Sequence, residues 1–431
     1  MACFNANLAF ICLLVYCRYE NLAIGIVLLR NVLQVCIKVN MDKKEKDKKS
    51  IAIITHYHNS LNYGGCLQAY ALSYFLTKCG YDVEQLCYDY SLETKKVNCT
   101  RTKKIFNKIK KIIKHPLMEL IIYPRYKVER TKSDSLNKHK EAMRNFRNKI
   151  PHSVNVYNKE TISNVEERYD IFITGSDQVW NFEWYHPAFF LDFVTQKPKI
   201  SYAASMAVDS LNENQKILIK EHLKDFNAIS VRENNALELL KDLTPILPIR
   251  VVDPVLLLDK EEWDNVSSER QIKDEYIFCY FLGNNKNERK IAKKFAKKKN
   301  LPIVTAIFSN NVLDFYFGAK RLYGVGPEDF ISLIKHSQYV FTDSFHAVVF
   351  SYIYKRQYFV FNREQTGVMN SRIISITNLF NASKRFCVGA EREKLKYVLS
   401  VEDIDYSKVN QSLDEIKTQS IEFLKRNLEK L

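Results

Sequence analysis

The sequence predicts an α/β fold in which short apolar strands alternate with amphipathic helices and form parallel sheets. Residues 50–88 show strand, helix and strand in turn, and residues 276–361 repeat this alternation several times. Polar residues gather where the strands end in both parts. Such alternation is typical of parallel sheets, whose carboxyl edge is where ligands bind in open α/β folds. We therefore look for function at the strand ends.

The first strand, Ser50–Thr55, is followed by a polar loop and an apolar helix. The helix begins near Gly64-Gly65 and is predicted to end at Gly80, before a second strand at Asp82–Tyr88. The chain has only 11 glycines in 431 residues, so an adjacent pair is informative here. Glycine lets backbone N–H groups approach a ligand closely. The pattern is not the dinucleotide fingerprint, which needs G-x-G-x-x-G.

Two later strands also end in polar or charged residues. The buried strand Asp170–Thr174 runs into the turn Gly175-Ser176-Asp177, with Gln178 next. The segment at 228–234 has the same pattern and places Arg232 at its end. A lone arginine is usually a surface charge, but one beside several polar strand ends is a candidate anion ligand.

Residues 339–351, YVFTDSFHAVVFS, place a histidine at the start of a helix. The apolar run stops at Thr342, and Asp343 or Ser344 is predicted to cap the helix that follows. His346 then lies at a helix N-terminus on the carboxyl edge of a sheet, a position that favours anions. A buried capping histidine without a function remains an open alternative.

The remaining elements follow the same alternation. We expect a strand at Val252–Leu258, a domain boundary at Asp259–Asp274 and an amphipathic helix at Ser412–Leu431. Between the last two, the pattern predicts strands at 276–282, 302–307, 339–342 and 358–361, and helices at 288–298, 327–336 and 347–354.

Eight short segments together resemble the polysaccharide pyruvyl transferase family. They occur in the expected order and span about residues 51–390. The segments are NYGGCLQAYAL (62–72), ITGSDQVWN (173–181), ISYAASM (200–206), ISVRE (229–233), VDPVLLL (252–258), GPEDFISLI (326–334), TDSFHAVVFS (342–351) and, more loosely, NSRIISI (370–376).

The resemblance implies two Rossmann-like domains facing a cleft, similar to the B-type glycosyltransferase (GT-B-like) architecture. It also implies transfer of a pyruvyl group from phosphoenolpyruvate to a sugar as a ketal, in cell-surface polysaccharide biosynthesis, with either a sugar or a lipid-linked oligosaccharide as the acceptor. Such transfer needs cations for the donor's two anionic ends and an acid for its vinyl carbon, but no redox cofactor. We assign catalysis to His346 and Asp177, donor binding to Arg232, Ser344 and Arg372, and acceptor binding to Asn62, Tyr63, Gly64 and Gln178.

Ser344 departs from the family pattern, in which an arginine often stands two residues before the histidine. Arg232, Arg372 or a lysine would then supply the missing charge. Two pairs of residues resemble metal ligands, but we expect no metal site. His56 and His58 lie in a loop where imidazoles are more often not ligands, and Asp403 and Asp405 are expected to form acidic surface.

Composition limits the partners and the compartment. The formal net charge of +16 favours anionic partners such as phosphorylated donors, acidic glycans or a phospholipid surface. Dispersed lysines without a recognisable motif argue against nucleic acid. The ten cysteines lack zinc-site spacing and indicate reduced thiols in the cytoplasm, with peripheral contact at the inner face of the plasma membrane as an open alternative.

The length favours two domains. We expect an N-terminal domain at 50–260 with a basic helical insertion at about 97–150, a C-terminal domain at 275–405 and a final helix at 406–431. The insertion is either a membrane-surface helix or a solvated hairpin. Residues 1–49 differ in composition, and three interpretations remain: a membrane anchor, a signal peptide, or a segment that is not native because Met41 is the true start.

Two other functions remain open at this stage. A glycosyltransferase could use a nucleotide sugar on the same fold, and donor binding would distinguish it. A non-catalytic glycan-binding protein would bind sugar without turnover, and the presence of Asp177, Arg232 and His346 argues against it.

Overall fold

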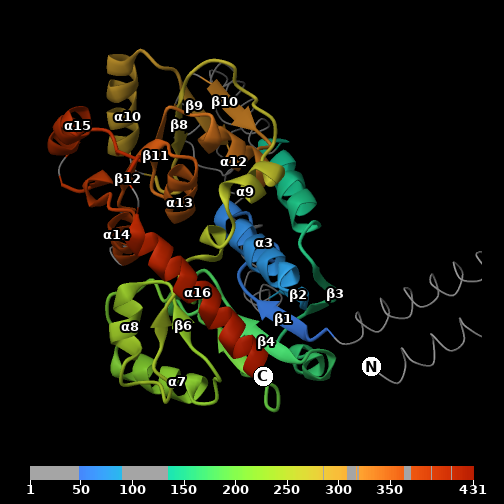
Figure 1. The fold of residues 1–431 in the computed structure, drawn as a ribbon. Coiled ribbons are helices and arrows are strands. Elements are labelled where there is room, and N and C mark those ends of the chain that lie inside the picture. The colour runs from blue at the N-terminus through green and yellow to red at the C-terminus, as the bar shows by residue number, and fades with distance from the viewer. Residues whose placement is uncertain are drawn as a thin grey trace, which may run out of the picture. The chain divides into compact units, whose positions relative to one another are not determined.

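The protein is described here from a computed structural model (Figure 1). The described residues are 48–89, 134–284, 286–307, 317, 320–363, 370–389, 391–408 and 410–431. The predictions for residues 1–47 and for the basic segment at 97–133 lie outside them. Residues 134–147 of the expected insertion are helical. Ser50–Leu431 form one compact unit.

The first sheet has five parallel strands in the order β3-β2-β1-β4-β5. Helix α3 (Tyr63–Lys78) connects the first two strands along the chain. Along the chain, β2 and then β3 are added on one side of β1, and β4 and then β5 on the other side. The strand order therefore reverses between β1 and β4, which is where open α/β sheets bind ligands. The strands are β1 (Ser50–Ile54), β2 (Asp82–Tyr88), β3 (His152–Tyr157), β4 (Ile171–Thr174) and β5 (Lys199–Ser201).

The second sheet has six strands in the order β10-β9-β8-β11-β12-β13, and its order reverses between β8 and β11. Its pairings are parallel throughout. The strands are β8 (Ile277–Tyr280), β9 (Ile303–Ile307), β10 (Lys320–Tyr323), β11 (Tyr339–Thr342), β12 (Gln357–Phe361) and β13 (Phe386–Cys387). The helices are α10 (Lys286–Lys299), α12 (Pro327–Lys335), α13 (Phe345–Ile353), α14 (Asn370–Leu379) and α15 (Glu391–Ser400).

Further elements lie outside the two sheets. The parallel pair β6 (Ser230–Val231) and β7 (Ile249–Arg250) extends beside the first sheet through isolated bridges such as Ala204–Val231. The other elements are η3 (Ile162–Arg168), η4 (Phe182–Trp184), η5 (Pro187–Phe190), α7 (Glu213–Leu223), α8 (Asn234–Leu240), η6 (Pro254–Leu256), α9 (Lys260–Val266), η7 (Ser383–Arg385) and α16 (Gln411–Lys430).

The predicted strand at Val252–Leu258 is wrong. Residues Pro254–Leu256 form the short 3₁₀ helix η6, and the Asp253 side chain accepts a hydrogen bond from the Val255 N–H at 3.1 Å. Proline has no N–H for a strand ladder but suits the first position of a helix, and aspartate is a preferred cap. The apolar composition of this segment suggested a strand, whereas the Asp-Pro pair decides its structure.

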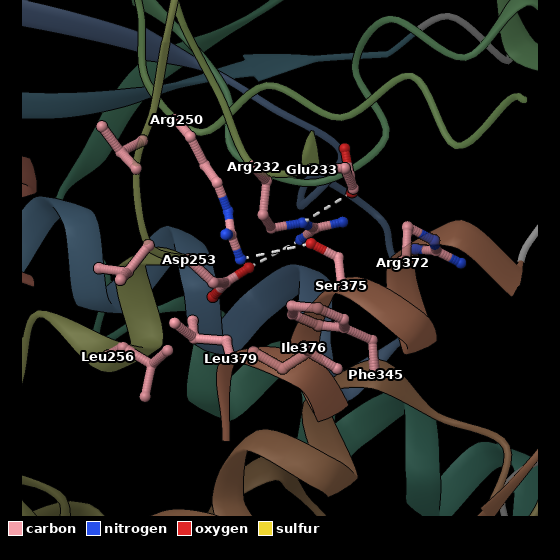
Figure 2. A pocket seen from close by; sticks show the side chains of 12 residues that line it. Arg232, Glu233, Arg250, Asp253, Leu256, Phe345, Arg372, Ser375, Ile376 and Leu379 are labelled. Carbon is pink, nitrogen blue, oxygen red and sulfur yellow. Dashed lines mark hydrogen bonds and ion pairs between the residues drawn. The ribbon is translucent and has the colours of Figure 1, made fainter. Parts of the chain in front are cut away.

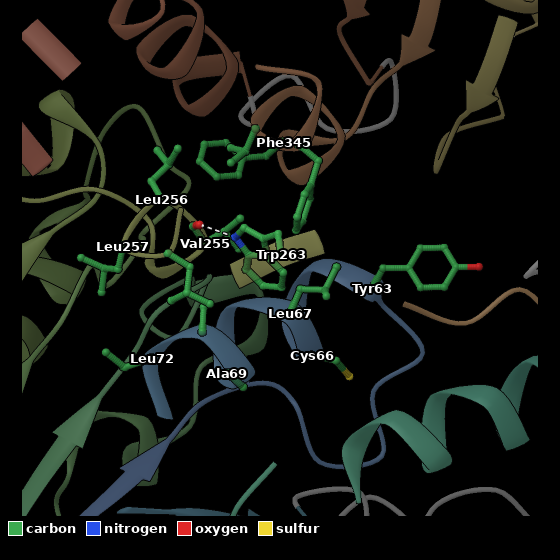
Figure 3. Packing of buried hydrophobic residues seen from close by; sticks show 14 of the residues in the cluster. Tyr63, Cys66, Leu67, Ala69, Leu72, Val255, Leu256, Leu257, Trp263 and Phe345 are labelled. Carbon is green, nitrogen blue, oxygen red and sulfur yellow. Dashed lines mark hydrogen bonds between the residues drawn. The ribbon is translucent and has the colours of Figure 1, made fainter. Parts of the chain in front are cut away.

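The main core lies around α3, between the two sheets (Figure 3). Leu67 of α3 and Trp263 of α9 are both fully buried, and the Trp263 ring packs edge-on against Phe350 of α13 at 4.9 Å. The indole N–H of Trp263 donates to the carbonyl of Val255 at 2.9 Å, so this buried polar group is satisfied. The core therefore joins α3 to the helix that carries His346.

Helix α16 lies beside residues from the first part of the chain (Figure 1). Its Ser420 hydroxyl accepts a hydrogen bond from the Val252 N–H at 2.9 Å, and its Phe423 ring lies 6.4 Å from that of Tyr202. The apolar side of the amphipathic helix α16 is thus buried. Among the described residues, no helix is both long and apolar enough to cross a membrane.

Most predicted elements are present with small shifts at their ends. β2 and β11 have the predicted bounds. α13 begins two residues earlier than expected, directly after Ser344, which is one of the two predicted cap residues. The fold is α/β, with two Rossmann-like parallel sheets, as the sequence predicts. The exact domain boundaries stay a prediction.

Candidate functional site

The loops after β1 and β4 are joined by the side chain of Gln68 from α3. Its amide nitrogen donates to the Thr55 hydroxyl at 3.0 Å, and its carbonyl oxygen accepts from the Ser176 N–H at 3.1 Å. The Thr55 hydroxyl in turn donates to the Ser176 carbonyl at 2.7 Å. Gln68 is fully buried, so these bonds fix the turn that carries Asp177.

Asp177 is buried and has a positive φ of 64°, which aspartate tolerates better than most residues. Its Oδ1 lies 3.7 Å from Nη2 of Arg232. Burial alone would raise the pKa of this carboxyl group. The positive charges of Arg232, His346 and Arg372 outweigh burial and hold the pKa below its usual value. Asp177 is therefore an anion that faces a cluster of cations.

Arg232 is the centre of this cluster (Figure 2). Its Nη1 donates to Asp253 Oδ2 at 2.7 Å and its Nε donates to Glu233 Oε1 at 3.1 Å. The guanidinium also lies over the Phe345 ring at 4.3 Å. Burial disfavours the charge, but Glu233, Asp253 and Asp177 raise the Arg232 pKa above its usual value. Nη2 is buried with no hydrogen-bond partner among the described residues, so it could bind a ligand oxygen.

His346 lies in the first turn of α13, after the cap residue Ser344. Its Nε2 is 3.5 Å from Asp253 Oδ2, the same oxygen that accepts from Arg232. On its other side the ring meets α3, because a Cβ on Gly64 would be 2.0 Å from Nδ1 of His346. Gly64 therefore permits a close approach between the two parts of the chain.

Three further arginines lie near Arg232. Arg250 donates to the Ser375 hydroxyl at 3.4 Å, and Arg372 projects from α14 (Figure 2). Burial first, and then the charge of Arg232, lower the Arg372 pKa to about 10, so the group is still a cation at neutral pH. Arg363 follows β12 and donates to the Asp343 carbonyl at 3.4 Å. The site thus contains more than one cation for an anionic substrate.

Two cavities adjoin this cluster. The first, the small cavity, has a volume of about 10 Å³ and is lined by Arg232, Arg250, Arg372 and the residues around them in Figure 2. The second, the polar cavity, has about 370 Å³, which is enough for a small ligand. It is lined by Thr55, His56, His58, Asn59, Ser60, Asn62, Tyr88, Asp89, Asp177, Gln178, Trp184 and Arg363.

The residues predicted to bind the acceptor have different positions. Asn62 and Gln178 line the polar cavity, while Asn62 also caps α3 by accepting from the Gly64 N–H at 2.9 Å. Tyr63 is fully buried, and its hydroxyl donates to the Val325 carbonyl at 3.0 Å. Its ring stacks on Phe330, so this side chain belongs to the core. Gly64 contributes the close approach to His346.

The predicted catalytic and donor residues are brought together. Asp177, Arg232, His346 and Arg372 act on one another electrostatically within a single cluster. Ser344 serves as the α13 cap, with its hydroxyl accepting from the Ala347 N–H at 3.5 Å. The His346 ring is not among the groups that line either cavity.

Sequence reasoning missed Asp253, Glu233 and Gln68 as site residues. Glu233 accepts hydrogen bonds from both Arg232 and Ser205, the latter at 2.6 Å. Asp253 and Glu233 lie in the quoted segments VDPVLLL and ISVRE. The available signal for both was that Arg232, if buried, needs an anionic partner. Gln68 also stands in a quoted segment, NYGGCLQAYAL, but its role could not be predicted because it depends on the distance between two loops. No cluster of three metal-binding side chains occurs among the described residues.

We expect the buried carboxylates to make the protein sensitive to acid. Asp177 and Asp253 both have pKa values below those of the unfolded chain, which are about 3.9. For groups of this kind, stability is fully present above about pH 5 and is lost as the pH falls through the unfolded and then the folded pKa. The urea midpoint should therefore stay constant from pH 7 to about pH 5 and decrease between about pH 5 and pH 3.

The Asp253→Asn variant separates this effect from that of other carboxylates. It should be less stable at pH 7, because Arg232 and His346 lose their anion, but its stability should fall less steeply below pH 5. Equal slopes for the variant and the wild type would show that Asp253 is not the source of the acid sensitivity.

Fold and site define an α/β protein with a charged cluster at the edges of two parallel sheets. The model of the family "Polysaccharide pyruvyl transferase" matches residues 62–365. The chain belongs to the polysaccharide pyruvyl transferase family. Comparison with curated proteins finds no match.

Several solved structures match most of the chain at low sequence identity. A putative UDP-N-acetylglucosamine 2-epimerase from Listeria monocytogenes is 12% identical with a TM-score of 0.49, covering 86% of this chain and 90% of its own. A UDP-GlcNAc 2-epimerase from Methanocaldococcus jannaschii, solved with UDP-GlcNAc and UDP, is 13% identical with a TM-score of 0.45, covering 86% and 99%. A glycosyltransferase from Rickettsia africae is 11% identical with a TM-score of 0.40, covering 89% and 99%.

Proposed function

We propose that the protein transfers a pyruvyl group from phosphoenolpyruvate to a sugar as a cyclic ketal. The observation that carries this proposal is the buried cluster of Arg232, Asp177 and His346 beside the polar cavity, in a chain of the pyruvyl transferase family. The cluster combines cations for an anionic donor with a carboxylate for a hydroxyl acceptor.

The donor is proposed to bind in the polar cavity, because the small cavity of about 10 Å³ has no room for it. Arg363 lines the polar cavity, and Nη2 of Arg232 lies next to Asp177 at its wall. These two cations would hold the donor's phosphate and carboxylate groups. Arg363 and Arg232 then supply charge that Ser344 cannot.

In the proposed reaction a proton adds to the methylene carbon of phosphoenolpyruvate, which becomes a methyl group. One sugar hydroxyl oxygen bonds to the neighbouring carbon, and a second hydroxyl oxygen displaces phosphate from that carbon and closes the ring. One of the two hydroxyl protons balances the proton taken up by carbon, and the other leaves with phosphate. His346 is the proposed acid, and its ring would have to move from its position beside Asp253 to reach the donor, whereas Asp177 already lines the polar cavity and orients or deprotonates the attacking hydroxyl.

The test is to incubate the full chain with phosphoenolpyruvate and a panel of galactosides, mannosides and N-acetylhexosaminides. We expect phosphate release together with a ketal product detected by mass spectrometry. The His346→Gln variant should be slower by about 100-fold or more, the lower range for loss of a general acid. A matched control is His152→Gln, because His152 lies on the edge strand β3 outside both cavities.

Three results would contradict the proposal or part of it. Wild-type turnover in His346→Gln would remove the histidine from the scheme. Release of UDP from UDP-sugars, without use of phosphoenolpyruvate, would indicate a glycosyltransferase. Sugar binding without turnover of either donor would indicate a non-catalytic glycan-binding protein.

A further inference from the structure

The polar cavity differs chemically from the arginine cluster beside it. Its lining contains neutral hydrogen-bonding side chains, namely Asn59, Ser60, Asn62 and Gln178. It also contains two carboxylates, Asp89 and Asp177, and a single arginine, Arg363. Amides and carboxylates are groups that bind the hydroxyls of a sugar. A ligand with several phosphates would find few cations in this lining.

Trp184 is an exposed aromatic residue in the lining of this cavity. Its exposed fraction is 47%, whereas the other two tryptophans of the chain, Trp180 and Trp263, are 1% and 0% exposed. Tryptophan combines a large apolar face with a polar N–H group and is enriched where a protein meets a partner, so an exposed indole at a polar cavity is a candidate ligand contact.

The segment that carries Trp184 is nevertheless anchored. Asn181 caps the 3₁₀ helix η4 by accepting from the Glu183 N–H at 2.9 Å, and its amide nitrogen donates to Gln178 Oε1 at 2.9 Å. The rings of Phe182 and Tyr185, on either side of Trp184 in the sequence, stack with centroids 5.8 Å apart. The indole is therefore presented from a fixed support next to Gln178, which favours binding because little ordering is needed.

We propose that Trp184 is the platform on which a sugar ring of the acceptor stacks. The C–H face of the ring would lie on the indole, while its hydroxyls bond to Asn62 and Gln178 and one hydroxyl reaches Asp177. This inference rests on the proposed function and names the substrate class of its acceptor side: a neutral pyranoside rather than a nucleotide.

The test uses the full chain without any donor. Quenching of tryptophan fluorescence by acrylamide reports on Trp184, because the other two tryptophans are buried. The probes are lactose, cellobiose, methyl β-mannoside and UDP. We expect at least one of the sugars to protect Trp184 from acrylamide, and UDP not to do so.

Variants separate stacking from a general effect on the fold. Trp184→Ala should weaken binding of the protecting sugar, measured by calorimetry, about tenfold, and Trp184→Phe should weaken it less. In turnover, Trp184→Ala should raise KM for the acceptor with little change in kcat. The control is Tyr74→Ala on α3, an aromatic residue 37% exposed and outside the cavity, which should leave sugar binding unchanged.

Protection by UDP alone, absence of protection by every probe, or unchanged sugar binding in Trp184→Ala would each overturn the inference. Circular dichroism and the thermal midpoint confirm that the variants are folded. Since phosphoenolpyruvate is absent, sugar binding at Trp184 together with no pyruvyl transfer would preserve this inference and reject the proposed function. Pyruvyl transfer with a normal acceptor KM in Trp184→Ala would preserve the proposed function and reject this inference.

Discussion

Replacement of Arg232 by methionine is expected to destabilise the protein by about 3–5 kcal/mol, the range for removal of one member of a buried ion pair. Methionine has a similar length, so the loss comes mainly from charge rather than from a cavity. Asp253 and Glu233 would each lose a hydrogen bond, and Asp177 would lose its nearest cation. Chemical denaturation of the variant and the wild type at pH 7 measures the difference.

A control and a second substitution make this result specific. Arg426→Met removes an exposed arginine of α16 and should change stability by less than about 0.5 kcal/mol. Adding Asp253→Asn to Arg232→Met should recover part of the loss, because the uncompensated carboxylate is removed as well. Equal stability of Arg232→Met and Arg426→Met would mean that the buried cluster is not held by this charge.

The Arg232→Lys variant tests whether Arg232 binds the donor. Lysine keeps the charge but lacks the planar fork that bonds Asp253 and Glu233 through separate nitrogens. We expect a folded protein that binds phosphoenolpyruvate at least tenfold more weakly by calorimetry. Unchanged donor affinity in a folded Arg232→Lys variant would place the donor elsewhere.

The sequence was sufficient to predict that Asp177, Arg232 and His346 lie close together. Asp177 follows β4, Arg232 follows β6 and His346 comes after β11, so each lies at the carboxyl end of a strand, where open α/β folds bind ligands. Because these strands belong to different sheets, the expectation that the residues meet came from the family resemblance, which implies two domains facing a cleft. The strand bounds followed from apolar runs that stop at polar residues, as in β11, where Thr342 is the last strand residue. These are local signals, and local signals predict local structure well.

The partners of these residues could not be predicted in the same way. The role of Asp253 depends on the 3₁₀ turn at Pro254, which the apolar composition of the segment concealed. Tyr63 and Asn62 are neighbours in the same polar stretch of the sequence. The rotation of α3 about its axis directs the Tyr63 side chain into the core, whereas the Asn62 side chain lies towards the cavity. That rotation depends on packing against Phe330, far along the chain, which a single sequence does not specify.

The contact between Gly64 and His346 leads to the second large effect. In Gly64→Ala the new Cβ would be 2.0 Å from Nδ1 and 2.6 Å from Cε1 of His346, so the imidazole has to move. Overpacking of this kind typically costs about 1–3 kcal/mol. Because the displaced ring also leaves Asp253, we expect turnover to fall about 100-fold, as for loss of the histidine itself.

A double-mutant cycle assigns the effect to this one contact. If the new methyl group is harmful only because it meets the imidazole, then His346→Ala removes the obstacle, and the Gly64→Ala/His346→Ala protein should be more stable than the two separate losses predict. The expected interaction energy is about 1–2 kcal/mol in favour of the double variant. Additive losses would show instead that Gly64 is required by the backbone of α3, for example for the N–H bond to Asn62, and that the position of His346 is set by α13 alone.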